Sequence, residues 1–125
     1  MSVEKLTTTN VEQLIEGSDT LIIDFWAPWC GPCQTFKPVF EAAAEKTEGV
    51  TFASCNTEDE QELAAMFQIR SIPTVMVFRE GVPVFGQPGA LPAPMLDELL
   101  EKVSALDMDE VREEVARRQK EAATA

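Results

Sequence analysis

The sequence has no histidine among its 125 residues. This absence excludes a histidine general base and removes the commonest side-chain ligand of metals. Cysteine is also scarce, because only Cys30, Cys33 and Cys55 are present. In a reducing compartment, so few thiols are typical of catalytic, metal-binding or packing residues and not of a structural disulfide framework.

Basic residues and long apolar runs are scarce as well. The chain carries 10 Lys and Arg against 22 Asp and Glu, which gives a formal net charge of −12. Nucleic acids and anionic membranes repel such a surface, so neither is expected as a partner. Residues 1–10 lack a basic segment followed by an apolar one, and no stretch is long enough for a membrane span. We therefore expect a cytoplasmic, globular protein.

The most informative stretch covers residues 24–33 and contains Cys30 and Cys33. It follows an apolar run at residues 21–23, typical of a strand buried on both faces, and it precedes a helical pattern. The two cysteines therefore lie at a helix start, where unpaired N–H groups and the backbone dipole stabilise a thiolate. A redox dithiol is the first interpretation and half of a zinc site is the alternative. A closed zinc site needs four ligands, and the rest of the chain offers one cysteine.

Hydrophobic periodicity predicts the order of the secondary structure. Strands are expected at residues 3–6, 21–26, 50–56, 74–78 and 82–86. Helices are expected from residue 11 to 17, from after Cys30 to Gly49, from the Thr57–Glu60 segment onward and over residues 92–106. The order β, α, β, α, β, α, β, β, α predicts an α/β fold with a mixed sheet between two helical layers.

A capping box is predicted at the third of these helices. Thr57 and Glu60 have the spacing in which each side chain bonds the backbone N–H of the other residue. The helix that they would open is expected to bury Leu63, Met66 and Phe67.

The composition changes after Leu106. Charges become dense, and pairs four residues apart are spaced for ion pairs along a helix: Glu113 with Arg117 and Glu114 with Arg118. The sequence thus predicts a domain at residues 1–106 and a charged, helical or frayed extension at residues 107–125. Besides alanines, only Met108, Val111 and Val115 are available as an apolar seam along this extension. Because they bury little surface, we expect a solvated tail; a helix that docks a partner or dimerises is the alternative.

Four motifs together resemble the thioredoxin family: residues 25–33, Pro38, Ile72-Pro73-Thr74 and Gly89-Ala90. The similarity extends from about residue 21 to about residue 103. It implies the thioredoxin fold, a central mixed β-sheet flanked by helices on both faces with the dithiol at the start of the second helix. The implied activity is that of a thiol–disulfide oxidoreductase that reduces disulfides in client proteins.

Disulfide reduction needs a nucleophile that is ionised near neutral pH and a second thiol that releases the product. Cys30 lies at the exposed end of the expected helix and is the candidate nucleophile. Cys33 is one turn further along the same side and can attack the Cys30 sulfur. Asp24 shares a strand face with Ile22 and Trp26, where burial raises a carboxyl pKa. The resemblance favours Asp24 as the proton acceptor for Cys33; a structural carboxylate bonded to backbone or water is the alternative.

The resemblance also implies a substrate-binding surface, made of Trp29, Gly31, Pro32, Ile72, Pro73 and Gly89. Pro73 would be the family's cis-proline, and Ile72 would lend its backbone to a bound client segment. Gly89 would allow the client to approach closely, and Trp29 would belong to the flat apolar surface around the sulfurs. Gly31 and Pro32 lie between the cysteines and influence the reduction potential.

Three positions depart from the family pattern. Ser54 stands where a lysine near the buried aspartate is usual, which weakens any role for such a lysine in tuning Asp24. Cys55 takes a place that is more often aliphatic, and it is expected to be a small core residue rather than a redox sensor or a dimerising thiol. Pro88 precedes Gly89, where a β-branched or aromatic residue is more usual.

The resemblance implies a monomer that needs no bound cofactor and no metal. Its electrons would come from NADPH through a flavoprotein thioredoxin reductase, and its clients would be proteins with disulfides. Electron transport for cell redox homeostasis in the cytoplasm is the expected role. Two alternatives stay open: a specialised thioredoxin-like protein that acts as an oxidant, an isomerase or a stress-linked reductase, and a chaperone or docking module that does not use the dithiol.

Overall fold

A five-stranded mixed sheet lies at the centre of the structure, a computed structural model that describes residues 3–124. The strands are β1 (Glu4–Lys5), β2 (Thr20–Trp26), β3 (Thr51–Asn56), β4 (Thr74–Arg79) and β5 (Val82–Pro88). Their spatial order is β1-β3-β2-β4-β5. The first three are parallel to one another, whereas β4 is antiparallel to both β2 and β5. The predicted mixed sheet is therefore confirmed.

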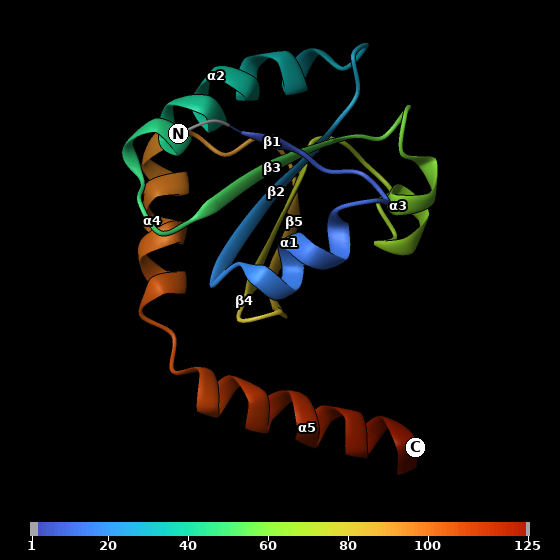
Figure 1. The fold of residues 1–125 in the computed structure, drawn as a ribbon, viewed down its shortest axis with the longest axis vertical. Helices are drawn as coiled ribbons and strands as arrows, with labels where there is room; N and C mark the ends of the chain where they lie inside the picture. The colour runs from blue at the N-terminus through green and yellow to red at the C-terminus, as the bar shows by residue number, and fades with distance from the viewer. Residues whose placement is uncertain (1–2, 125) are drawn as a thin grey trace.

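Helices cover both faces of this sheet (Figure 1). They are α1 (Val11–Gly17), α2 (Gly31–Lys46), α3 (Gln61–Met66), α4 (Ala93–Ser104) and α5 (Met108–Thr124). α2 and α4 pack on one face, α1 and α3 on the other, and α5 follows as a separate helix (Figure 1). The predicted order of elements is confirmed. Within residues 3–124, no helix has the length and hydropathy that crossing a bilayer requires.

The core follows from the alternation of side chains along β2. Ile22 joins the cluster beneath α2 and α4, whereas Leu21, Ile23 and Phe25 join the cluster beneath α1 and α3. All four side chains are fully buried, and burial of each contributes about 2 kcal/mol. The strand reads as one apolar run because both of its faces are covered.

Asp24 interrupts this run on the face that α2 covers. It is in register with Ser54 of β3 on one side and with Val75 of β4 on the other. Since alternate residues share a face, Asp24 lies on the same side of the sheet as Ile22. The central strand therefore carries a carboxylate beneath the helix that bears the two cysteines.

The capping box predicted at α3 is wrong. The Thr57 hydroxyl donates to the Trp26 carbonyl at 3.0 Å, and the Glu60 carboxylate accepts the Thr8 N–H at 3.2 Å. Helix α3 begins after Glu60 without a side-chain cap. Leu63 is buried as expected, but Met66 is 65 % exposed, so that expectation is also wrong. The short helix presents only one narrow stripe to the sheet.

The C-terminal extension forms a helix that contacts the domain. Met108, its first residue, is 5 % exposed, and Arg112 pairs with Glu80 at 2.7 Å. Of the two predicted ion pairs, that of Glu114 with Arg118 forms at 2.9 Å. The other differs from expectation, because Arg117 also pairs with Glu114. The beginning of α5 is therefore anchored, while its later turns are exposed.

We expect Met108→Ala to destabilise the protein by about 2 kcal/mol, because a buried methionine side chain is lost. Val115→Ala on the same helix is the control, and it should cost less than half as much because Val115 is only partly buried. Urea unfolding followed by circular dichroism measures both values. Equal costs at the two positions would show that Met108 does not anchor α5.

Candidate active site

The dithiol lies at the junction of β2 and α2. Cys30 is the N-cap of α2, and its Sγ accepts the Cys33 N–H at 3.2 Å. The two sulfurs are joined as a disulfide, with Cα atoms 5.3 Å apart. Pro32 occupies the first turn, where its missing N–H costs no hydrogen bond. The helix therefore presents its positive end to Cys30, an arrangement that stabilises a thiolate at that sulfur.

The two cysteines lie one helical turn apart, and both are largely buried. Cys30 is 5 % exposed at the helix start, whereas Cys33 is 2 % exposed and faces the interior. Between them, an added Cβ at Gly31 would meet no atom within 4 Å, so packing does not require glycine there. Gly31 and Pro32 both lie at the surface of the site.

The loop before β4 lies against the dithiol. The Ile72–Pro73 peptide bond is cis, as the resemblance implies, and the Ile72 carbonyl oxygen is 3.8 Å from Cys30 Sγ. Ile72 also packs against the cluster formed by the two cysteines and Ala27. The Gly89 N–H donates to the Pro73 carbonyl at 2.7 Å. Gly89 has φ +109°, a conformation that favours glycine, so the backbone beside Pro73 suits this residue type.

The two tryptophans of the stretch have different surroundings. Trp29 is 71 % exposed beside the dithiol, and its indole N–H donates to the Glu58 carboxylate. Trp26 is partly buried and packs against the cluster that contains both cysteines. Exposed apolar surface at Trp29 is suited to contact with another protein. Ile72 lies next to both Trp29 and the two cysteines.

Asp24 is buried without a complete set of hydrogen bonds. The residue is 3 % exposed, and its Oδ1 has no hydrogen-bond partner. Burial raises the pKa of the Asp24 carboxyl to about 7, because desolvation disfavours the charged form. A carboxyl group with this pKa can exchange a proton near neutral pH.

A pocket of about 210 Å³ connects Asp24 with Cys33. Its other lining residues are Val3, Trp26, Gln34, Lys37, Phe40, Glu41 and Ser54. The volume and the polar lining allow water to enter. Sequence reasoning missed Lys37 as a member of this site. Its spacing of four residues from Cys33 along α2 is the signal that could have found it.

Cys55 lies away from this site. It is fully buried in the cluster beneath α1 and α3, on the other face of the sheet. Burial first, and then the nearby charge of Glu60, raises the pKa of the Cys55 thiol to about 12. This thiol stays protonated near neutral pH, which agrees with the expected packing role.

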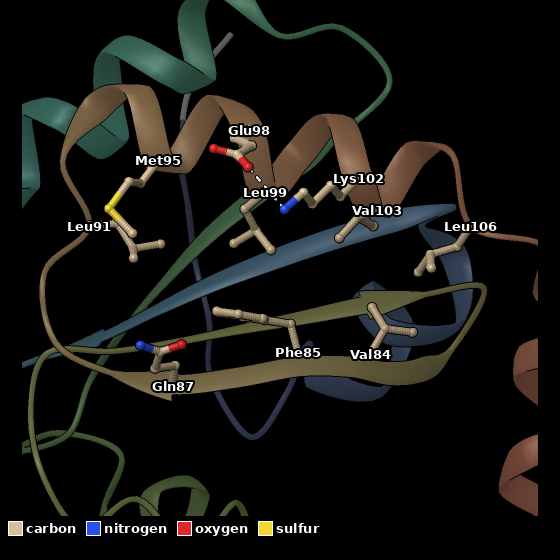
Figure 2. A pocket seen from close by; sticks show the side chains of 10 residues that line it. All are labelled: Val84, Phe85, Gln87, Leu91, Met95, Glu98, Leu99, Lys102, Val103 and Leu106. Atoms are coloured by element: carbon tan, nitrogen blue, oxygen red, sulfur yellow. Dashed lines mark ion pairs between the residues drawn. The ribbon is translucent and has the colours of Figure 1, made fainter.

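A second pocket, between β5 and α4, is also separate from the dithiol. Its volume is about 350 Å³. Figure 2 shows Phe85, Leu99 and Val103 along its wall. Lys102 and Glu98 lie at its rim and pair with each other at 2.9 Å (Figure 2). It contains neither a cysteine nor an unpartnered buried carboxylate, so it takes no part in the chemistry described above. Within residues 3–124, no cluster of three or more His, Cys, Asp or Glu side chains is arranged to hold a metal.

Known proteins are similar to this chain over most of its length. The thioredoxin family model matches residues 2–102. A protein of Streptomyces coelicolor described as "Putative thioredoxin 2" is 48 % identical over 121 residues, covering 97 % of this chain and 90 % of that protein. That match includes nearly all of α5, which lies beyond the family model.

Solved structures of other proteins have a similar fold. A mutant thioredoxin from Halobacterium salinarum has a TM-score of 0.78 and 30 % identity, over 85 % of this chain and 94 % of that one. A chain from a structure on thiol resolution in yeast mitochondrial 1-Cys peroxiredoxin via the glutathione/thioredoxin systems has a TM-score of 0.73. It is 28 % identical and covers 80 % of this chain and 95 % of that one.

The raised pKa of Asp24 predicts how stability depends on pH. Since its carboxyl binds a proton more tightly in the folded state, folding stability falls as pH rises from about 3.8 through about 7. Asp24→Asn removes this penalty and should increase the free energy of unfolding by about 4 kcal/mol at pH 8, at about 1.36 kcal/mol for each unit by which the pKa is raised. The gain should shrink to nearly zero at pH 4.

Urea unfolding of the oxidised protein at both pH values measures this difference. Asp97→Asn on the exposed surface is a matched control for the loss of one negative charge. A gain for Asp24→Asn that is the same at pH 4 and pH 8 would contradict the assigned pKa.

Proposed function

The chain belongs to the thioredoxin family of thiol–disulfide oxidoreductases, and from this premise we propose that it reduces client disulfides as a cytoplasmic electron carrier. One observation carries the proposal: Cys30 lies at the N-terminus of α2 with its sulfur beside the Ile72 carbonyl. This places a stabilised thiolate next to backbone that a client segment can bind. A reductant and not an oxidant is proposed because the motif is that of the family whose potential lies near −270 mV.

The first step is attack by the Cys30 thiolate on a client disulfide. A bond forms between Cys30 Sγ and one client sulfur, the client S–S bond breaks, and the other client sulfur leaves as a thiolate. Ile72 and Gly89 supply backbone on which the client segment lies, and Trp29 supplies exposed apolar surface. Main-chain hydrogen bonds give affinity with little dependence on the client sequence.

The second step is resolution by Cys33. Its S–H proton passes to the Asp24 carboxylate through the shared pocket, and the resulting thiolate attacks Cys30 Sγ. The Cys30–Cys33 bond forms, the mixed disulfide breaks and the client leaves with two electrons. Burial of Asp24 supports this role, because it brings the carboxyl pKa to about 7. A general base is most effective when its pKa lies near the pH at which it works.

Regeneration requires two electrons from outside the chain. We assign them to NADPH through a flavoprotein thioredoxin reductase, as in the family. The protein itself then acts without a bound cofactor, and a monomer is sufficient. The similarity to a chain from the peroxiredoxin structure supports oxidised thiol peroxidases as one class of client.

A coupled assay with insulin, thioredoxin reductase and NADPH tests the function. The wild-type protein should oxidise NADPH, and Cys30→Ser should reduce the rate to background because the nucleophile is lost. Cys55→Ser should keep most of the wild-type rate, since this buried thiol is outside the site. Absence of NADPH oxidation by the wild type would remove the proposed function. A full rate with Cys30→Ser would favour a role that is independent of the dithiol.

Cys33→Ser should trap the mixed disulfide, because attack by Cys30 proceeds and resolution does not. Mass spectrometry after incubation with a small disulfide peptide should find an adduct on Cys30 that dithiothreitol removes. The reverse variant, Cys30→Ser, should accumulate far less adduct. Equal trapping by both variants would contradict the assigned order of attack.

A further inference from the structure

The pocket above Asp24 has a single cationic side chain among the described residues that line it. This is Lys37, one turn along α2 from Cys33. Its Nζ lies 6.0 Å from the centroid of the Trp26 ring, and Trp26 lines the same pocket. Cation–π contact at this distance on an exposed side chain is weak, so the ammonium group moves from the ring at little cost.

We propose that Lys37 is a positioning residue for the resolution step: its ammonium group enters the mouth of the pocket and stabilises the Asp24 carboxylate through water. The proposal rests on the proposed role of Asp24 as proton acceptor. The proton that moves comes from the Cys33 thiol and goes to the Asp24 carboxylate, so Lys37 takes no part in the transfer itself. Its contribution is therefore electrostatic.

The geometry explains why Asp24 benefits from such a cation. Its Oδ1 has no hydrogen-bond partner, and the residue is 3 % exposed. Ser54, its partner in β3, carries no charge, and Val75 on the β4 side is apolar. With Lys37 over Trp26, burial is what raises the carboxyl pKa. A cation that can reach the water of the pocket favours the carboxylate form and so offsets part of the rise in pKa that burial causes.

Other charged and titratable groups near the pocket oppose or compete with this effect. Glu41 lines the pocket from α2, one turn beyond Lys37, and its negative charge disfavours the carboxylate form of Asp24. Lys5 of β1 is in register with Ser54, two strands from Asp24, but it does not line the pocket. Cys33 lines it too, and its thiol titrates only after reduction. Lys5 is therefore the matched control for Lys37.

The experiment is a titration of the Asp24 carboxyl carbon by NMR in the oxidised protein. In this state Cys30 and Cys33 form a disulfide and do not titrate, and the Cys55 pKa of about 12 lies outside the range. Lys37→Gln should raise the midpoint by about half a pH unit, the effect of losing a solvated cation several Å away. Lys37→Arg should keep the wild-type midpoint, because the charge is retained.

The matched variants decide between this proposal and a general effect of charge. Lys5→Gln should leave the Asp24 midpoint unchanged, and Glu41→Gln should lower it. An unchanged midpoint in Lys37→Gln overturns the proposal, and so does an equal rise in Lys5→Gln. Because the titration needs no client and no reductase, its result does not depend on the proposed function.

Turnover then tests the consequence for catalysis. In the coupled assay, Lys37→Gln should lose about half of its rate at pH 7 and recover it at pH 8.5, because a higher pKa leaves less carboxylate at neutral pH. Lys37→Arg should follow the wild-type profile. A rate loss in Lys37→Gln that is the same at every pH would indicate a structural or client-contact role and overturn the proposal.

Discussion

The connection from β2 to α2 fixes the position of every reacting group. Two donors from Thr57 hold the last carbonyl of β2, that of Trp26: the backbone N–H at 2.8 Å and the hydroxyl at 3.0 Å. Ala27 follows with no exposed surface, and its carbonyl accepts the Cys30 N–H at 3.2 Å. The chain therefore turns sharply before α2 begins. This turn sets Cys30 at the helix start and Cys33 over the strand residue Asp24, so the sulfurs and the carboxyl share one region of the fold.

Local patterns in the sequence were sufficient for most of the fold and for the centre of the site. The burial of Asp24 follows from its place in an apolar strand, and the helix start follows from the cysteine spacing and Pro32. Local patterns failed where a distant segment competes for the same group. The spacing of Thr57 and Glu60 is typical of a helix cap, but the Thr57 hydroxyl donates its hydrogen bond to the Trp26 carbonyl instead. By composition Lys37 resembles a solvated helix residue. Its spacing of four residues from Cys33 places the two on one side of α2, and the packing of α2 on β2 then makes that side part of the pocket.

The extension after the domain illustrates the same limit. Composition alone describes α5 as charged and poor in apolar residues, which is true of its exposed turns. Its attachment depends on pairs across the fold, such as Arg112 with Glu80 in the turn between β4 and β5. The neighbouring Arg79 donates to the carbonyls of Val103 and Ser104 at 2.6 and 3.3 Å, which caps the end of α4. These contacts join the β4–β5 hairpin to the end of α4 and to the beginning of α5. The composition of the sequence changes at this same point.

The three cysteines show how position alone separates reactive from inert thiols. Cys55 has no exposed surface, and burial together with Glu60 holds its thiol protonated. Cys30 is also largely buried, but its sulfur accepts an N–H from the first turn of α2, and that hydrogen bond favours the thiolate. Cys33 has the low exposure of Cys55 and also a pocket that it shares with a carboxyl of raised pKa. Low exposure therefore does not decide the reactivity of these thiols. What decides it is the neighbouring group that stabilises the thiolate or accepts its proton.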